Sequence, residues 1–538
     1  MALPDYFGRN AVAIAQAISG LDEQRLTSAL ENVRVGITIA RDARAAEGRA
    51  IADLLVRLLA RLYPTLVFRS EHGESPAADA HSLASRINPR IEFVGEPTIE
   101  IVIGATKLQR WAPMRIMVGS RGWDASASIS RVQSCGNTEN PFGPGAAACL
   151  AAANLFRQVF LSEPRLDENA TFRTLNSADT NGRAVTLRGD LGQVVLAGAG
   201  AIGNAAAWAF ARTPMTGTLC AIDPERLDLG NLQRYVLAER SDVDAPKPAI
   251  LERYFTGSFR AVSYIGDLAS FIAAQTRPLD RLLLALDSAR DRRMGQACLP
   301  GWIANAWTQA GDLGVSTHDF LSGACVRCLY LPERPLANED AIIAEAFGVP
   351  QKVMEIRTLL YRNDGVPRSL LEAIAGARNL PLERLLPFEG RLVRDLYREG
   401  FCGGAVIPLS AIGAPRSDVH VPLAHQSALA GVLLAAAAVR NALVGDSLSQ
   451  ITQLDLLKPL PAILIRPAAK DPRGICICQD EDYRDAYKAK FHDHSIPAVG
   501  TRAAPAAVKR KATAKPPAAP PRATQRRSKL HQSKGRRP

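Results

Sequence analysis

The fold is decided by the stretch Gln193-Val194-Val195-Leu196-Ala197-Gly198-Ala199-Gly200-Ala201-Ile202-Gly203. Its first five residues predict a short buried strand, and a helix predicted at Asn204–Arg212 follows the glycines directly. A second strand, predicted at Thr218–Ile222, ends at Asp223, which stands 20 residues after Gly203. Glycines permit a tight turn, a helix N-terminus offers N–H groups to phosphate, and an acid here accepts hydrogen bonds from ribose hydroxyls. The stretch therefore predicts a nucleotide-binding βαβ unit.

The residues after this unit narrow the choice of nucleotide. Asp223-Pro224-Glu225 closes the second strand, Asn231-Leu232-Gln233-Arg234 comes next, and Lys247 follows. A further strand, predicted at Leu282–Leu286, ends in Asp287. A NAD-dependent dehydrogenase is the default interpretation of the glycine motif, but it gives no reason for this series. The series resembles the superfamily of ubiquitin-activating enzymes and the related adenylating enzymes of thiamine and molybdopterin biosynthesis.

This resemblance implies a role for each residue of the series. Arg234 and Lys247 would be the catalytic cations that face the β and γ phosphates of ATP. Asp287 would hold Mg²⁺, and Asn231 would hydrogen-bond phosphate or ribose. The glycines and one acid would form the remaining cofactor-binding set, namely Gly198, Gly200, Gly203 and Asp223. For any one of these residues alone, a surface charge or loop cap is the simpler interpretation.

Four cysteines in two close pairs suit a metal site. They are Cys325 and Cys328, in a C-x-x-C pattern, and Cys476 and Cys478, in a C-x-C pattern. Four thiolates suit a tetrahedral structural Zn²⁺, and the resembled family carries such a site. The second pair departs from the family's usual C-x-x-C, so a redox pair and simple buried thiols stay open as alternatives.

Cys402 stands apart from these pairs, because glycines follow it and a helical insert precedes it. In the resembled family such an insert carries the thioester cysteine, so the resemblance implies that Cys402 is the nucleophile. The alternative is a buried thiol, the commonest state of a free cysteine. His420 and His425 are near in sequence, although His425 has the pattern of a core or capping histidine. The other thiols are expected to be core or incidental residues: Cys135, Cys149, Cys220 and Cys298.

The expected class is α/β, with a Rossmann-like adenylation domain preceded by a degenerate, inactive adenylation-like half. The expected boundaries are 1–175 for the inactive half, 176–335 with 405–490 for the active domain and its zinc site, 336–404 for the helical cysteine insert, and 491–538 for a disordered basic tail. Residues 1–175 have strand and helix patterns but no nucleotide loop, and Gly143-Pro144-Gly145 is expected to be a turn before a helix at Ala146–Phe160. An arginine of the inactive half commonly reaches ATP in this family, and Arg9 and Arg25 are the candidates.

The composition excludes a collagen-like, a wholly disordered and a multi-span membrane protein. The hydrophobic share is 47% and the charged share 22%, which is ordinary for a globular chain. The net charge of +12 comes from residues 501–538, which hold twelve Lys or Arg and no acid, so residues 1–500 are balanced. The basic tail is expected to solubilise, with binding to nucleic acid or an acidic partner kept open. The apolar run Ala428–Val439 is too short for a membrane span and predicts a buried helix. Without a secretory signal, the thiols indicate a cytoplasmic protein.

The resemblance implies a two-step function. ATP would adenylate the C-terminal glycine of a ubiquitin-like protein, and Cys402 would form a thioester before transfer to an E2-like conjugating enzyme. The cofactors would be ATP, Mg²⁺ and Zn²⁺, and the context would be a bacterial conjugation system, with antiphage defence as a candidate role. A sulfur-carrier adenylyltransferase of the thiamine or molybdopterin type is the alternative, although such chains are shorter. A non-catalytic scaffold would predict damage at Arg234, Lys247 or Asp287, and all three are present.

Overall fold

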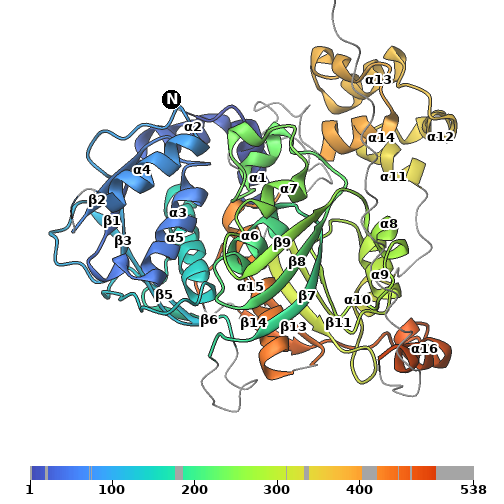
Figure 1. Cartoon of the computed structure of the whole chain (residues 1–538). Helices are drawn as coiled ribbons and strands as arrows, with labels where there is room; N and C mark the ends of the chain where they lie inside the picture. The colour runs from blue at the N-terminus through green and yellow to red at the C-terminus, as the bar shows by residue number, and fades with distance from the viewer. Residues whose placement is uncertain are drawn as a thin grey trace, which may run out of the picture. The chain divides into compact units, whose positions relative to one another are not determined.

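The structure is a computed structural model, and two mixed sheets form its framework (Figure 1). It describes residues 3–18, 22–71, 73, 75–175, 186–309, 312–331, 339–402, 421–445, 448–460 and 463–491. The predicted basic tail lies outside these residues, apart from Phe491, and so does most of the predicted boundary at 176–188.

The first sheet has six strands in the order β2-β1-β3-β4-β5-β6. Strands β1 to β4 are parallel neighbours, whereas β4–β5 and β5–β6 are antiparallel. In chain order the elements are α1 (Phe7–Ala17), α2 (Glu23–Asn32), β1 (Val35–Ile39), α3 (Ala46–Leu59), β2 (Leu66–Ser70), α4 (Ser75–Ile87), β3 (Ile99–Ile103), β4 (Met114–Arg121), β5 (Asp124–Ser128), α5 (Phe142–Phe160) and β6 (Ala170–Arg173).

The second sheet has eight strands in the order β14-β13-β12-β11-β10-β7-β8-β9. Strands β9, β8, β7, β10 and β11 are parallel, and the order reverses beside β7. The strands are β7 (Asp190–Ala197), β8 (Thr216–Ile222), β9 (Phe259–Tyr264), β10 (Arg281–Leu284), β11 (Trp302–Gln309), β12 (Asp312–His318), β13 (Gln450–Leu454) and β14 (Ile463–Pro467). Their helices are α6 (Ala201–Phe210), α7 (Lys247–Glu252), α8 (Leu268–Ala273), α9 (Ala289–Ala297), α10 (Val326–Tyr330), α15 (Ala424–Val444) and α16 (Glu481–Phe491).

The two sheets share one topology. The order β2-β1-β3-β4-β5-β6 corresponds to β8-β7-β10-β11-β12-β13, with the same parallel and antiparallel neighbours. In each sheet a helix follows the central strand: α3 follows β1, and α6 follows β7. A long helix precedes the corresponding antiparallel strands β6 and β13, namely α5 and α15. Helices α5 and α15 also pack against each other. Only β9 and β14 of the second sheet lack a counterpart.

The predicted elements are present, with three corrections at their ends. Gly143-Pro144-Gly145 was expected to be a turn but lies in the first turn of α5, where proline is tolerated because its missing N–H needs no partner. Helix α6 begins at Ala201, inside the glycine motif. Strand β10 ends at Leu284, so Asp287 lies in the following loop rather than at the strand end.

Helix α15 is the core helix that the apolar run predicted. It is long and apolar enough to cross a bilayer, yet 72% of its most apolar 18-residue window is buried inside the protein. Gly431 lets it approach α6 closely, because a Cβ there would lie 2.3 Å from the Ile202 carbonyl oxygen. The helix therefore joins the two halves instead of leaving the fold.

Residues 339–402 form a helical segment with its own hydrophobic cluster (Figure 1). Leu370, Leu371, Ile374 and Phe347 are buried in this cluster. Its elements are α11 (Glu339–Ala346), α12 (Val353–Arg362), α13 (Arg368–Arg378), α14 (Val393–Asp395) and a π-helical turn at Leu396–Cys402. The helices match the pattern expected for the insert, while the domain boundaries themselves stay predictions.

Candidate functional site

The glycine loop lies at the carboxyl end of β7, beside the point where the strand order reverses. Ligands of open parallel sheets bind at such a crevice. Gly198 has a φ of +99°, and a Cβ on it would lie 2.5 Å from the Ala285 carbonyl oxygen. A Cβ on Gly203 would lie 2.1 Å from the Gly198 carbonyl oxygen. Both positions thus require glycine, so that the loop can turn tightly into α6.

Asp223 follows β8 and turns back to the glycine loop. Its carboxylate accepts hydrogen bonds from the backbone N–H groups of Ala199 and Glu225, each at 2.9 Å. The side chain is buried, and burial raises its pKa, although Lys247 opposes that shift. Asp223 therefore ties the glycine loop to the end of β8.

The Asn-Leu-x-Arg motif forms a tight helical turn at Leu229–Gln233. Asn231 caps this turn, because its side-chain oxygen accepts from the Asp228 N–H at 3.1 Å. Arg234 follows the turn and is half-buried, and its Nη1 donates to Gln233 Oε1 at 3.1 Å. Burial lowers the pKa of Arg234, while Tyr235 and Asp287 favour its charged form. Arg234 is thus a partly desolvated cation, and its guanidinium carbon lies 6.0 Å from the Tyr235 ring centre.

Lys247 begins α7 and lies against the same group of residues. It is 5% exposed, contacts the Glu225 carboxylate and stands 5.5 Å from the Tyr235 ring centre. Burial alone would lower the pKa of Lys247, but Tyr235, Glu225 and Asp223 raise it above the usual range. The side chain is therefore a permanently charged ammonium held at the carboxyl edge of the sheet.

Of the predicted nucleotide residues, Asp223 bonds the glycine loop, and the charged groups of Arg234 and Lys247 lie 6.0 Å and 5.5 Å from the Tyr235 ring centre. Asp287 is exposed in the loop between β10 and α9, free of the sheet and open to solvent. Two site residues were not predicted: Glu225, which pairs with Lys247, and Tyr235, whose hydroxyl lies 3.5 Å from where a Cβ on Gly200 would be. Both belong to the motif region, so their position beside Asp223 and Arg234 was the available signal.

The first half also reaches this site. Tyr6 packs in one hydrophobic cluster with Ala201, Leu232 and Tyr235. Arg9 is buried on α1, which packs against the turn that carries Asn231. Arg25, the other candidate arginine, is exposed on α2, which packs against α5. Among the two arginines, the described structure places Arg9 on the helix that contacts the motif.

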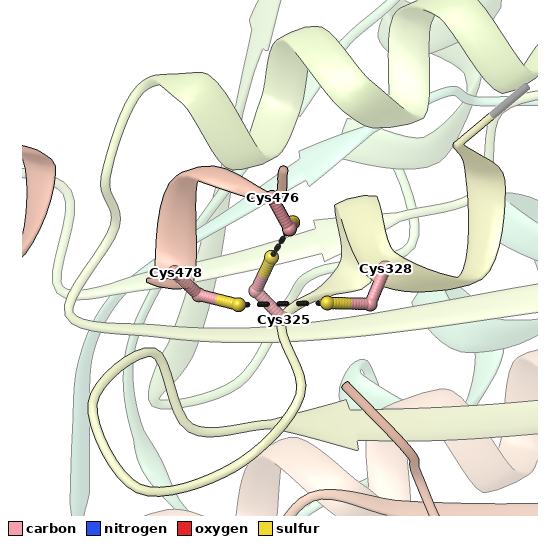
Figure 2. A group of neighbouring side chains, drawn as sticks. All are labelled: Cys325, Cys328, Cys476 and Cys478. Atoms are coloured by element: carbon pink, nitrogen blue, oxygen red, sulfur yellow. Dashed lines mark hydrogen bonds between the residues drawn. The ribbon is translucent and has the colours of Figure 1, made fainter. Parts of the chain in front are cut away.

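The four paired cysteines meet in one cluster (Figure 2). The sulfur atoms of Cys325 and Cys476 are 3.4 Å apart, as are those of Cys328 and Cys478, and all four lie within 4.8 Å of one another. A tetrahedral Zn²⁺ with Zn–S bonds of about 2.3 Å separates its sulfur ligands by about 3.8 Å. The cluster is therefore of the right size to hold a metal ion, and three of its four thiols are buried.

The remaining cysteines and histidines differ from this cluster. The backbone of Cys402 ends the π-helical turn, but its side chain, the glycines after it and His420 lie outside the described residues. His425 is buried in α15, and burial next to Arg157 lowers its pKa to about 3. His425 is thus buried as a core histidine, and its Nε2 finds no partner among the described residues. Being neutral, it offers no positive charge to a thiolate.

A comparison with protein families finds a match in the first half of the chain. Residues 39–161 match the family described as Prokaryotic E2 family C. Among solved structures, E. coli MccB with MccA-N7isoASN has a TM-score of 0.33 and 13% identity over 53% of this chain and 66% of that chain. E. coli MccB with ATP has a TM-score of 0.32 and 13% identity over 53% and 65% of the two chains.

A relative matches almost end to end. The "Uncharacterized protein y4jF" of Sinorhizobium fredii (strain NBRC 101917 / NGR234) is 37% identical over 508 residues, which cover 91% of this chain and 98% of that protein. The E2-type match falls where the sequence predicts an inactive adenylation-like half. Identity of this extent shows that the chain belongs to the same family as y4jF.

Proposed function

We propose that this protein activates the C-terminal carboxylate of a ubiquitin-like protein with ATP. The observation that carries the proposal is a connected group at the switch point of the parallel sheet. Asp223 bonds the glycine loop, and Arg234 and Lys247 lie beside the Tyr235 ring, whose hydroxyl is 3.5 Å from where a Cβ on Gly200 would be. A carboxylate oxygen would attack the α-phosphorus, and pyrophosphate would leave with its charge matched by the two cations. Asp287 is an exposed carboxylate in the loop after β10 and suits Mg²⁺, which would neutralise phosphate charge.

The second proposed step is thioester formation. The Cys402 thiolate would attack the acyl carbon of the adenylate, and AMP would leave. Support comes from its place at the end of the helical segment 339–402, in a π-helical turn, a geometry common at functional sites. Transfer to a conjugating enzyme would follow, and the E2-type match is consistent with a ubiquitin-like conjugation system.

The acceptor is proposed to be a separate protein, although the E2-type match makes residues 39–161 a second candidate. That stretch holds two cysteines, Cys135 and Cys149. Cys149 is fully buried in α5. Burial, Asp42 and Glu47 raise the pKa of the half-buried Cys135 thiol well above its usual range. Neither thiol is therefore prepared to accept an acyl group in this structure.

The strand order supports an inactive adenylation-like half at residues 1–175. Where the active half has its glycine loop after β7, the first half has acidic residues after β1. Asp42 accepts from the Cys135 N–H at 2.8 Å, and buried Glu47 accepts from the Thr138 hydroxyl at 2.7 Å. These bonds draw the segment before α5 across the place that corresponds to the nucleotide loop. Two carboxylates there would also repel phosphate.

ATP–pyrophosphate exchange tests the proposed activity. The full chain is mixed with Mg-ATP, labelled pyrophosphate and a ubiquitin-like protein that ends in glycine. We expect exchange that requires the ubiquitin-like protein and stops when the C-terminal glycine of that protein is removed, because its carboxylate is the acyl donor. Exchange without any thioester would favour the sulfur-carrier adenylyltransferase. Absence of both exchange and ATP binding would refute the proposal.

A further inference from the structure

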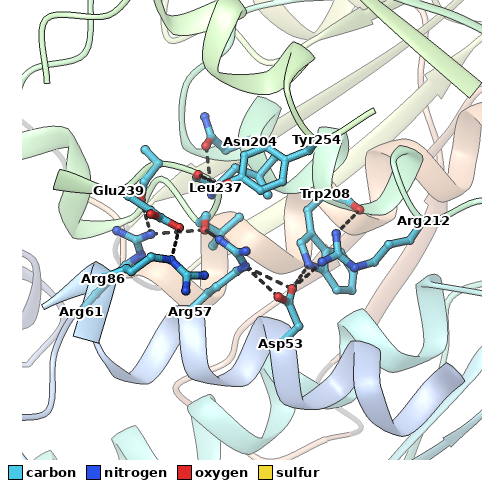
Figure 3. A network of polar contacts seen from close by, with 12 residues as sticks. Asp53, Arg57, Arg61, Arg86, Asn204, Trp208, Arg212, Leu237, Glu239 and Tyr254 are labelled. Carbon is cyan, nitrogen blue, oxygen red and sulfur yellow. Dashed lines mark hydrogen bonds and ion pairs between the residues drawn. The ribbon is translucent and has the colours of Figure 1, made fainter. Parts of the chain in front are cut away.

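Two arginines of the first half donate hydrogen bonds to backbone carbonyl oxygens of residues 232–238, in the second half (Figure 3). Arg61 donates to the carbonyl oxygens of Leu232 at 2.5 Å, Val236 at 3.2 Å and Ala238 at 2.7 Å. Arg57, one turn earlier in the chain, donates to the Val236 oxygen at 3.0 Å. Residues 232–238 include Arg234 and Tyr235, so the segment that the arginines contact carries the proposed phosphate-binding cation.

The segment has few other backbone partners. It lies in neither a strand nor a long helix, so its buried carbonyl groups depend on side chains for hydrogen bonds. The Tyr254 hydroxyl donates to the Leu237 carbonyl oxygen at 2.6 Å, and the Asn204 side chain of α6 accepts from the Leu237 N–H at 3.2 Å. Asn204 also donates to Ala199 of the glycine loop at 2.9 Å. The hydrogen bonds that hold residues 232–238 therefore connect, through Asn204, to the glycine loop.

The charge of Arg61 is placed at a cost. The side chain is 1% exposed, and burial lowers its pKa, while Tyr6 and Glu239 favour the charged form. Within the described residues it makes no ion pair with a carboxylate, and three carbonyl dipoles surround its guanidinium instead. A buried cation kept without a paired carboxylate is unusual, because an apolar side chain would fill the same space more cheaply.

Arg57 is anchored differently. Its Nε contacts both oxygens of Asp53 at 3.1 Å, and Asp53 also accepts from Trp208 and Arg212 of the α6 region at 2.7 Å each. Burial alone would raise the pKa of Asp53, yet Arg57 and Arg212 keep it below its usual range. The Asp53 network thus fixes α3 against α6 and so sets the place from which both arginines reach the segment.

From these contacts we infer that Arg61 and Arg57 are positioning residues, through which the inactive half holds residues 232–238 in their nucleotide-binding shape. The inference rests on the proposed function, because it assigns the first half a task within the same ATP site. It explains why a half without a glycine loop remains bound to the active one. The expected consequence is that nucleotide affinity depends on a residue that touches no nucleotide.

The test measures binding of Mg²⁺ with α,β-methylene-ATP to the full chain by calorimetry. Arg61→Met removes the arginine donor of the Leu232 and Ala238 carbonyls and leaves only Arg57 on Val236, so we expect the Kd to rise at least about tenfold. Arg61→Lys keeps the charge but offers a compact ammonium, so an intermediate Kd is expected. Hydrogen exchange should show lost amide protection in residues 229–238, with protection kept in β7 and β10.

Two control variants separate positioning from general destabilisation. Arg157→Met removes another buried arginine, which donates to the Leu456 oxygen at 3.1 Å in α5's contact with residues 456–458. It should lower thermal stability without changing the Kd. Arg86→Ala removes an exposed arginine that pairs with Glu239 at 3.2 Å, next to the same segment, and should change the Kd less than about twofold.

Each outcome decides between the claims. Wild-type binding that Arg61→Met leaves unchanged would overturn the positioning role and leave the proposed function standing. An equal loss of affinity in Arg157→Met would also overturn it, because general destabilisation would then suffice. Failure of the wild-type chain to bind the analogue would overturn both the proposed function and the inference drawn from it.

Discussion

Replacing Arg234 or Lys247 by alanine is expected to lower the rate of ATP–pyrophosphate exchange about 100- to 1,000-fold. Both cations are held at the carboxyl edge of the sheet beside the glycine loop, and charge develops on the phosphates as pyrophosphate leaves. Lys247 is almost fully buried, so its charge acts through little water. Arg234→Lys should recover part of the rate, because a lysine keeps the charge but loses the planar fork that binds two phosphate oxygens.

Arg226→Ala is the matched control for these variants. Arg226 is an exposed cation in the same stretch of chain, eight residues before Arg234, and it contacts the Asp244 carbonyl oxygen rather than the site. Its loss should change the exchange rate less than about threefold, as for other surface charges. If Arg226→Ala fell as far as Arg234→Ala, the rate loss would reflect net charge and the assignment of Arg234 would fail.

Removing the metal from the cysteine cluster is expected to destabilise the second half strongly. We expect one Zn²⁺ per chain in protein purified without chelator, since four thiolates at this spacing match a tetrahedral site. The site joins residues 151 positions apart, and structural Zn²⁺ binding is folding free energy. Loss of about 5 kcal/mol corresponds to a fall in Tm of about 10–20 °C.

Cys325→Ser tests this expectation by metal analysis and thermal unfolding. Serine keeps the side-chain size but is a poor zinc ligand, so both the zinc content and the Tm should fall. Cys298→Ser serves as the control, because Cys298 is a half-buried thiol outside the cluster, bonded to the Met294 oxygen at 3.2 Å. A metal-free wild-type protein with an unchanged Tm after chelation would show that the cluster is a group of buried thiols.

The sequence predicted the nucleotide loop because its signal is local. Gly198 and Gly203 are required by contacts within the loop and with the strand beside it, and these leave a fixed spacing in the sequence. The cysteine cluster was predicted for a related reason, since each close pair announces half of a site. The end of β10 was misjudged because Leu286 is as apolar as the strand residues before it.

Contacts between the two halves left no such signal. Arg57 lies on α3 and Arg61 just beyond the end of that helix, and arginines in such positions ordinarily face solvent. Their partners are backbone carbonyls 171 to 179 residues away, and a carbonyl is the same in every residue. Tyr6 reaches Ala201 and Tyr235 by packing alone. These relations depend on how the sheets stack, which a single sequence does not encode in any local pattern.

The measurement that most directly tests the account is a thioester assay on the full chain. Wild type, Cys402→Ala and Cys135→Ser are each mixed with Mg-ATP and a ubiquitin-like protein that ends in glycine, then separated on a non-reducing gel. The account predicts an ATP-dependent, thiol-sensitive adduct in wild type and Cys135→Ser, and none in Cys402→Ala. An adduct that persists in Cys402→Ala and disappears in Cys135→Ser would contradict it, and would place the acyl-accepting thiol in the first half.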